Sequence, residues 1–495
     1  MIGRYREIKQ LNEACDSQKS EFIAIYGRRR VGKTYLVEQM FSSQRKDCLY
    51  FEFTGAYKLS TKAQIENFTE QVFVWFRATP TVDVDDWMSA FRFLKQTLVA
   101  EIQHNSDKKV ALFFDEVPWV DKNNSEGFLA ALGYFWNTYC QKDKIFTVII
   151  CGSNASWIKN KIFDDSEGPL YKRLTSKIPM KPFDLKETKK YLQQEIGMDI
   201  DDRLATEVYM CVGGVAKYLS YFDKSKDVYE NIDNLFFNVD GMLYDEYHTV
   251  FKSLFQQKSG IHKAIMDALS NPSQDRTVLG LVESLKNFSR GPIDSAIDEL
   301  VLCGFIKGIG RYNHKSKGVN YIVIDPLCDF YNKWVKEKSK NDMLNLSLPY
   351  WGAIAEKQEY AVWAGLRFES VCLANIDLFT SARGLRSIVK NVSYWNYADE
   401  TKSGKGAQID IIVKYNNDVY DLVECKYVNK PFSIDSHYAK NLLNKKVQFR
   451  EHGLKGRVRS DIKTVMLTTF GCIKNTGYST ARVAADITLE DILRD

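Results

Sequence analysis

Three runs of apolar residues in the first third of the chain are too continuous for strands on a protein surface. They cover Phe22–Tyr26, Val110–Phe114 and Phe146–Ile150. Strands with this pattern are typically buried on both faces, as in a parallel sheet that is covered by helices. Because amphipathic segments separate the runs, residues 1–183 are predicted to form a doubly wound α/β domain.

After residue 183 the apolar residues recur with the period of a helix. Leu185–Glu195 and Leu204–Val212 are predicted helices, and residues 184–245 are expected to form a helical lid. Further helices, followed by a short hairpin rich in lysine and glycine, predict a winged helix over residues 246–340.

The last part of the chain, residues 341–495, begins with helical spacing and then alternates apolar and polar residues. Strands are predicted at 409–415, 419–427 and 463–469, which indicates a separate mixed α/β domain. No apolar run approaches the roughly 20 residues that cross a bilayer, and the charged N-terminus lacks the apolar stretch of a signal peptide. We therefore expect a cytoplasmic protein without a membrane segment.

The amino-acid composition limits the class of protein but does not indicate its function. A chain of 495 residues with 45% hydrophobic and 26% charged residues predicts several globular domains. The 68 Lys and Arg residues exceed the 63 Asp and Glu residues by five, which permits nucleic-acid binding without requiring it. The ten cysteines lack the spacing of metal or redox motifs, so they are expected to be small buried apolar residues.

A glycine-rich segment directly after the first predicted strand carries the clearest chemistry. Residues 27–34 read GRRRVGKT and match GxxxxGK[ST], in which backbone N–H groups surround a phosphate chain at a helix N-terminus. Lys33 is expected to reach the β- and γ-phosphates of ATP, and Thr34 to ligate Mg²⁺. The residues expected to contact the nucleotide from this segment are Gly27, Arg28, Arg29, Arg30, Val31, Gly32, Lys33, Thr34 and Tyr35.

Two acidic residues end the second apolar run, at the sheet edge where the nucleotide is expected. Asp115 is predicted to hold Mg²⁺ through water, and Glu116 to polarise the water that attacks the γ-phosphate. The pair predicts ATP hydrolysis rather than binding alone. The alternative is a solvated strand end, which is common in α/β proteins.

Together these residues resemble the AAA+ and STAND-like ATPases, and specifically an archaeal and bacterial family whose loop reads GRRRVGKT. The resemblance covers about the first 335 residues. It implies that Gly3 and Arg4, with Glu7 and Leu11, form an N-terminal segment over the adenine.

The same resemblance implies roles for later residues. Ser153 or Asn154 corresponds to the family's sensor position, which contacts the nucleotide site. Arg173 is a candidate for γ-phosphate contact, either in cis or as an arginine finger in trans, and the second would require a homo-oligomer. Ala216 stands where the family commonly has a proline in its lid, which puts the lid's nucleotide contact in doubt.

The sequence does not determine whether the predicted winged helix binds DNA or a protein. Its recognition helix by position, 292–302, carries three acidic residues on the face expected to be exposed, and these would repel phosphate. They are Asp294, Asp298 and Glu299, whereas the wing carries the basic residues Lys307, Arg311, Lys315 and Lys317. A contact with a protein partner and a DNA contact through the wing therefore both remain open.

A second group of charged residues lies near the C-terminus. The pattern ExK occurs four times, but only Glu424 and Lys426 lie in an alternating strand, so both side chains point to one face. Asp410 can join them from the preceding strand, across a hairpin at 416–418. Two carboxylates and a lysine on one face are what metal-assisted phosphodiester hydrolysis requires. A solvated ion pair between strands is the structural alternative.

The segment from GAQIDIIV to LVECKY resembles the PD-(D/E)xK nuclease superfamily over about residues 355–470. The resemblance implies a restriction-endonuclease-like fold, DNA as substrate, and a metal site formed by Glu369, Asp410 and Glu424. Gln448 fits the polar residue that often follows on a helix. The superfamily also contains members that bind DNA without demonstrated cleavage.

The leading hypothesis is an ATP-hydrolysing switch joined to a metal-dependent nuclease-like domain that acts on DNA. In this hypothesis Lys33, Glu116 and Arg173 serve ATP hydrolysis, while Glu424 and Lys426 serve cleavage of DNA. One alternative is a nucleotide-gated DNA- or protein-binding regulator that does not cleave. A third reading is a sensor of an unknown ligand, with the nuclease as its effector.

Overall fold

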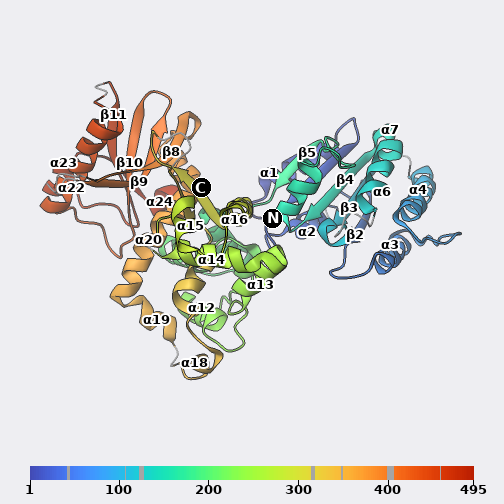
Figure 1. Ribbon diagram of the computed structural model, residues 1–495, viewed down its shortest axis with the longest axis horizontal. Coiled ribbons are helices and arrows are strands. Elements are labelled where there is room, and N and C mark those ends of the chain that lie inside the picture. Colours follow the sequence, from blue (N-terminus) through green and yellow to red (C-terminus); the bar gives the residue numbers. More distant parts are fainter. Residues whose placement is uncertain are drawn as a thin grey trace. The chain divides into compact units, whose positions relative to one another are not determined.

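The computed structural model describes residues 1–41, 45–105, 107–121, 127–271, 273–313, 318–346, 349–398, 406–456 and 459–494. The chain divides into two compact units, Met1–Pro182 and Phe183–Asp495 (Figure 1). Lys315 and Lys317 of the predicted wing lie outside the described residues.

The first unit contains a five-stranded parallel sheet flanked by helices. Its strands lie in the order β2-β3-β4-β1-β5, so that β4 separates β1 from β3. The elements are α1 Tyr5–Cys15, β1 Glu21–Tyr26, α2 Lys33–Gln39, β2 Cys48–Thr54, α3 Thr61–Phe76, α4 Trp87–His104, β3 Lys109–Asp115, α5 Val117–Val120, α6 Phe128–Phe135, α7 Gln141–Asp143, β4 Phe146–Gly152, α8 Ala155–Ile158 and β5 Ser176–Pro179.

Both faces of this sheet are buried, which explains the continuous apolar runs in the sequence. Alternate residues of β1 enter two different cores: Phe22 packs in the cluster that includes α3, α4 and α6, and Ile23 in the cluster that includes α1 and α2. The predicted strands 22–26, 110–114 and 146–150 are thereby confirmed as β1, β3 and β4. The parallel α/β sheet of the prediction is also confirmed.

The second unit begins with the helices that were expected to form a lid. They are α9 Leu185–Tyr191, α10 Asp202–Val212, α11 Ala216–Leu219 and α12 Val228–Phe236. The break after α10 has a packing role, because a Cβ on Gly214 would meet the backbone oxygen of Phe183 at 1.9 Å. Phe183 N–H also donates to the Gly214 carbonyl at 2.7 Å, so this turn fixes the start of the unit.

The middle of the second unit consists of helices and a two-stranded antiparallel hairpin. Its elements are α13 Glu246–Phe255, α14 Ser259–Ser270, α15 Val278–Ser284, α16 Arg290–Leu302, β6 Ile306–Gly310, β7 Val319–Val323, α17 Pro326–Phe330 and α18 Lys340–Leu344. Helix α16 covers the predicted recognition helix. Asp298 is exposed as expected there, whereas Asp294 and Glu299 are half-buried, and the Glu299 carboxylate pairs with the buried His262 imidazole at 2.7 Å.

The C-terminal part is a mixed five-stranded sheet with the order β12-β11-β10-β9-β8. Its elements are α19 Tyr350–Ala355, α20 Gln358–Ala374, α21 Ile376–Ala382, β8 Val389–Tyr397, β9 Ala407–Tyr415, β10 Val419–Lys426, α22 Ser436–Gln448, β11 Asp461–Thr468, α23 Thr476–Ala481, β12 Val483–Thr488 and α24 Leu489–Leu493. Strands β8, β9 and β10 pair antiparallel, while β11 and β12 continue the sheet in parallel. The predicted hairpin between β9 and β10 is confirmed.

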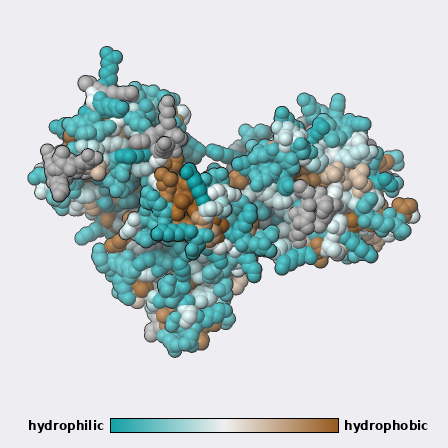
Figure 2. All heavy atoms as spheres, viewed as in Figure 1, coloured by the Kyte–Doolittle hydropathy of each residue, from teal (hydrophilic) through white to brown (hydrophobic). Residues whose placement is uncertain are grey.

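Short π-helical or 3₁₀ turns accompany these helices at Trp136–Cys140, Lys159–Phe163, Leu192–Ile196, Gln256–Lys258, Tyr331–Val335, Arg386–Ile388 and Phe449–Gly453. Among the described residues, no helix combines the length and apolar character needed to cross a membrane. The face of the molecule shown in Figure 2 is mostly hydrophilic.

Candidate functional site

The glycine-rich loop lies between the end of β1 and the start of α2, at the carboxyl edge of the sheet. Gly27 (φ +147°) passes so close to the 179–182 segment that a Cβ would meet the Met180 oxygen at 2.1 Å. Gly32 caps α2 with φ +94°, a conformation that favours glycine. The two glycines therefore set the curvature that points backbone N–H groups toward a phosphate.

Lys33 is buried within this loop. Its ammonium donates to the carbonyl oxygens of Gly27 and Arg28, each at 3.0 Å. The cation is thus held among the backbone groups that would surround a phosphate chain, where it can turn to phosphate oxygens.

The loop and the acidic strand end meet as the sequence predicts. The Thr34 hydroxyl, on the first turn of α2, donates to Asp115 Oδ2 at 2.5 Å. Asp115 ends β3 and is 3% exposed, and its other oxygen accepts from the Glu116 N–H at 2.8 Å. These contacts place one hydroxyl and one carboxylate side by side, as a Mg²⁺ site beside a nucleotide requires.

Glu116 is held in a defined position by the end of β4. The Ser153 hydroxyl and the Ser153 N–H both donate to Glu116 Oε2, at 3.0 and 3.2 Å. Burial and the negative charge of Asp115 raise the pKa of Glu116, while Lys33 and Ser153 partly offset this. Its backbone has φ +46°, which is uncommon for a residue other than glycine and often marks a functional position.

The N-terminal segment contacts the glycine-rich loop through Arg4. Arg4 is 4% exposed and donates to the carbonyl oxygens of Val31 and Lys181, both at 2.9 Å, and Glu7 lies 3.7 Å from its guanidinium. Leu11 packs in the core beneath α1. The segment thus contacts the loop, and its expected place over the adenine stays a prediction.

The remaining predicted loop residues differ in exposure. Arg28 and Val31 are buried, Arg29 and Arg30 are half-buried, and the Tyr35 side chain is exposed. Arg173 is exposed, and within the described residues its side chain has no hydrogen bond or ion pair. Asn154 accepts from the Trp157 N–H and caps α8, so Ser153 is the residue of this pair that contacts Glu116.

The C-terminal sheet brings Asp410 and Glu424 together. Strands β9 and β10 pair up to Ile411 opposite Val423, and one further step in this register sets Asp410 opposite Glu424. Residues opposite each other in an antiparallel pair share a face of the sheet. The prediction that these two carboxylates share a face therefore agrees with the register.

Glu424 is surrounded by cations. Lys445 Nζ lies 2.7 Å from Oε2, Lys426 Nζ lies 3.2 Å from Oε1, and the Tyr438 hydroxyl donates to Oε1. Burial of the carboxyl would raise its pKa, but the two lysines outweigh burial and lower it. Glu424 is therefore an anion over the whole neutral range of pH.

Glu369, on α20, lies within electrostatic range of the same group. Burial and the charges of Asp410 and Glu424 raise its pKa to about 7, against the opposing effect of Lys426 and Lys445. The structure thus gathers the predicted acids into one electrostatic group. Across the described residues, however, no three acidic, histidine or cysteine side chains converge into a ready metal cage.

The predicted Gln448 lies at the end of α22 and is buried, and its Nε2 faces Asn444 Oδ1 at 3.4 Å. It lies one turn after Lys445, on the helix that supplies the contacts to Glu424. In the described part of the chain, the Gln448 side chain makes no hydrogen bond with Asp410 or Glu424.

The comparisons with known proteins agree with the geometry of the first site. Residues 1–222 match a family described as an ATPase domain predominantly from Archaea. These residues form a P-loop ATPase domain.

Two relatives extend the comparison beyond this domain. An uncharacterized protein of Methanocaldococcus jannaschii is 24% identical over 440 residues, covering 86% of this chain and 87% of that protein. The Walker-type ATPase of Pyrococcus abyssi has 16% identity and a TM-score of 0.50, covering 67% of this chain and 96% of that one. The similarity to the Pyrococcus abyssi structure supports the ATPase fold.

Sequence analysis missed three residues of the C-terminal group. Tyr438 and Lys445 are seven residues apart on α22, so they share one helix face, and this spacing after the ExK strand could have indicated them. Arg276 precedes α15 in the chain. Burial and the charge of Arg367 lower the pKa of Arg276, while the charges of Asp410 and Glu369 raise it. Arg276 therefore lies close enough to these two acids to interact with them. No local pattern marks Arg276, because only the tertiary structure brings it there.

The described basic residues of the wing make hydrogen bonds within the second unit, and a phosphate contact through the wing stays a prediction. Lys307 donates to the Leu373 carbonyl at 3.1 Å, and Arg311 donates to the Asn396 carbonyl at 2.7 Å. Next to them, Tyr312 is buried against Tyr420 and Phe449 of the C-terminal sheet. The wing of the ATPase therefore packs on its own C-terminal domain.

Proposed function

We propose that this ATPase is a nucleotide-controlled switch whose C-terminal domain binds DNA and cleaves phosphodiester bonds with a divalent metal. The observation that carries the proposal is the position of Asp410 and Glu424 on adjacent strands, each one residue beyond the pair Ile411 and Val423, with Lys426 beside Glu424. Phosphodiester hydrolysis needs this combination of oxygen ligands and a cation.

The residues fit a magnesium ion without a complete protein cage. Mg²⁺ is usually held by one or two carboxylates and keeps several waters, so Asp410 and Glu424 are sufficient protein ligands. Burial, and after it the charges of Asp410 and Glu424, raise the pKa of Glu369. A divalent cation would offset the second of these effects. When bound, the metal would neutralise phosphate charge and make its water more acidic.

Each residue of the site would then have a separate role. Asp410 and Glu424 would hold the metal, and Glu369 would accept or hold a proton at the site. Lys426 would face the scissile phosphate, and Lys445 would keep Glu424 ionised and oriented through its 2.7 Å contact.

In the first unit, Thr34 and Asp115 would hold Mg²⁺ beside the phosphates of ATP, and Lys33 would neutralise them. Glu116 would orient the attacking water, and Arg173 would contact the γ-phosphate. Changes of nucleotide state would reach the C-terminal domain through the lid, because α10 packs against α20, the helix that carries Glu369.

The deciding experiment is cleavage of plasmid and linear DNA with Mg²⁺ or Mn²⁺, with and without ATP. We expect Asp410→Asn and Glu424→Gln to lower the cleavage rate by about 10² or more, since each removes a metal ligand. The matched control is Glu490→Gln, which makes the same change at an exposed residue of the same unit. Lys33→Ala tests whether cleavage depends on nucleotide.

A second candidate function is a nucleotide-gated regulator that binds DNA or protein without cleaving. It is favoured by the contacts of Glu424, whose two oxygens are already engaged by Lys426, Lys445 and Tyr438. If the wild type hydrolyses ATP but cuts no DNA under any of these conditions, and still binds DNA in a gel-shift assay, this second function replaces the first.

A further inference from the structure

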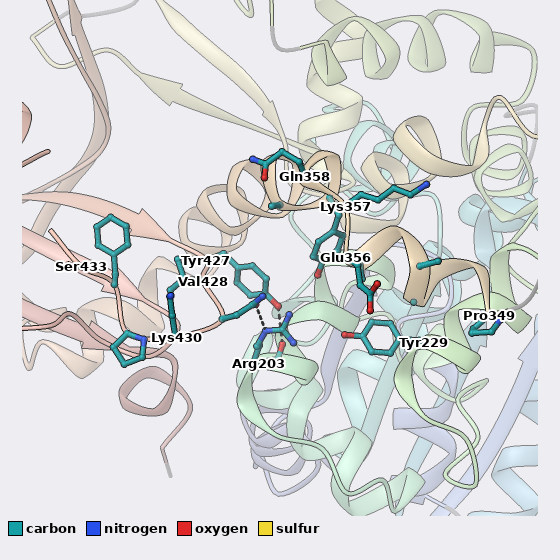
Figure 3. A pocket seen from close by; sticks show the side chains of 18 of the residues that line it. Arg203, Tyr229, Pro349, Glu356, Lys357, Gln358, Tyr427, Val428, Lys430 and Ser433 are labelled. Carbon is teal, nitrogen blue, oxygen red and sulfur yellow. Dashed lines mark hydrogen bonds between the residues drawn. The ribbon is translucent and has the colours of Figure 1, made fainter. Parts of the chain in front are cut away.

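A large cavity lies in the second unit, and its lining includes none of Glu369, Asp410 and Glu424. Its volume is about 1230 Å³, and Figure 3 shows the side chains that surround it. The walls come from α10, α12, the 349–361 segment and the 427–433 segment that directly follows β10. Pockets for small organic ligands usually measure about 300–1,000 Å³, so this one has room for a larger ligand.

Aromatic rings line much of this cavity. They belong to Tyr229, Tyr360, Tyr427 and Phe432. The Arg203 guanidinium lies over the Tyr427 ring at 5.6 Å and donates to Asn429 Oδ1 at 3.2 Å. Rings and a stacked guanidinium of this kind are typical surfaces for holding planar bases.

The wall also contains a group of buried polar side chains. Tyr360 is 4% exposed, and its hydroxyl lies near the Glu207 carboxylate and the Tyr427 hydroxyl, without a well-aligned hydrogen bond to either. The Glu207 carboxylate is fully buried, 3.8 Å from the Arg203 guanidinium. A ligand that reaches the Tyr360 hydroxyl would give it a well-aligned hydrogen-bond partner.

The rim of the cavity is cationic. Lys357 and Lys430 are exposed, and within the described residues neither side chain has a hydrogen bond or an ion pair. With Arg203 they place three cationic side chains around the opening, against one exposed carboxylate of the lining, Glu356. The ligand that matches this charge is an anion.

We propose that this cavity binds a phosphorylated nucleoside unit larger than a mononucleotide, either a free dinucleotide or the end of a single strand. The bases would lie against the tyrosine rings, with the Tyr360 hydroxyl as a hydrogen-bond partner. The phosphates would lie near Arg203, Lys357 and Lys430. Both sources of the ligand share this chemistry.

The cavity is built from the elements that carry the C-terminal acids. Helix α20 begins in its wall and carries Glu369, and the 427–433 segment continues β10, which carries Glu424 and Lys426. A ligand in the cavity would therefore fix the spacing of α20 and β10. This consequence rests on the proposed function, but binding itself does not.

Binding is measured by calorimetry on the full chain with Lys33→Ala, which removes the contribution of the ATP site, and in EDTA, which removes cleavage. The probes are a 5′-phosphorylated thymidine dinucleotide, a 5′-phosphorylated strand of about 12 nucleotides, and a circular single strand without ends. We expect Lys357→Glu with Lys430→Glu to weaken binding of the first two probes by about tenfold or more. The control pair Lys224→Glu with Lys252→Glu makes the same charge change at exposed lysines outside the cavity, and should have no effect.

A second variant tests the rings. Tyr229→Leu should weaken binding of the dinucleotide but not of inorganic phosphate. If the 12-mer binds more tightly than both the dinucleotide and the circle, the ligand is a strand end. If the dinucleotide and the 12-mer bind equally, the ligand is a free dinucleotide. Both results support the site. The proposal is overturned if neither linear probe binds, if the circle binds as tightly as both, or if the cavity and control pairs behave alike. Because no cleavage is involved, failure of the proposed nuclease activity would not affect this result.

Discussion

Glu116 is oriented by contacts with the residues next to it at the ends of β3 and β4. Ser153 supplies two donors to one carboxylate oxygen, and Asp115 fixes the backbone of Glu116 through its N–H. An oriented carboxylate with a raised pKa can position water and accept a proton from it. We therefore propose that Glu116 serves hydrolysis, whereas Lys33 and the loop serve binding.

We expect Glu116→Gln to keep ATP affinity but to lower the turnover rate by about 10²–10³, as loss of a general base does. Lys33→Ala should instead weaken ATP binding itself. The measurements are ATP turnover and equilibrium binding of a labelled nucleotide, with Glu66→Gln, an exposed glutamate of α3, as control. Equal turnover in Glu116→Gln and wild type would remove Glu116 from the reaction.

The pKa of Glu369 predicts a dependence of stability on pH. The folded chain binds this proton more tightly than the unfolded chain, because the pKa rises from 4.5 to about 7 on folding. The free energy of unfolding should therefore fall as pH rises through this interval, by up to about 3 kcal/mol from this group.

Denaturation of metal-free wild type and Glu369→Gln at pH 5 and pH 8 measures this effect. The variant should lose less stability than the wild type between the two pH values. Glu359→Gln, an exposed residue on the same helix, is the control and should follow the wild type. A Glu369→Gln curve parallel to wild type would contradict the raised pKa.

At the scale of elements, the β6–β7 wing packs against the C-terminal sheet of the second unit. Tyr312 N–H donates to the Tyr394 carbonyl at 2.8 Å, its ring packs in the C-terminal core, and its hydroxyl pairs with the Tyr420 hydroxyl at 3.0 Å. These contacts join the wing to β8 and β10. Movement of the winged helix would therefore act directly on the sheet that carries Asp410 and Glu424.

We expect Tyr312→Ala to lower the free energy of unfolding of the second unit by about 3 kcal/mol, since a buried ring is lost. Tyr312→Phe keeps the ring and loses only the hydroxyl contact, so its effect should be about 1 kcal/mol. Urea denaturation followed by tryptophan fluorescence measures both. Equal effects of the two substitutions would show that the ring does not stabilise the docked wing.

At the scale of the whole molecule, Arg173 is the predicted catalytic residue whose side chain, among the described residues, makes no hydrogen bond or ion pair. Its side chain is exposed on the first unit, and no described side chain pairs with it. This favours a role in trans, with the arginine of one copy reaching the γ-phosphate bound to another.

If so, ATP turnover per chain should rise with protein concentration, and Arg173→Ala should abolish this rise without affecting dilute protein. An arginine finger changes turnover by about 10³ or more in some ATPases and GTPases, so the effect should be large. Sedimentation measures assembly over the same concentrations, and Lys172→Ala is the control at the neighbouring exposed residue. A loss of turnover in dilute Arg173→Ala would indicate a role in cis.

The sequence by itself determined the features that depend on neighbouring residues. The loop at 27–34, the acidic end of β3 and the hairpin between β9 and β10 are all local, because glycines, turn residues and strand alternation act over a few positions. Continuous or regular apolar runs also identified the three central strands of each sheet: β1, β3 and β4 in the first, and β9, β10 and β11 in the second.

The tertiary structure alone decided the rest. The four strands that the sequence did not predict, β2, β5, β8 and β12, are the edge strands of the two sheets. Edge strands are partly solvated, so their residues carry a mixed pattern without a clear period. The approach of Lys445, Tyr438 and Arg276 to the acids, and the docking of the wing, join residues far apart in the chain. Only the packing of the elements brings such residues together.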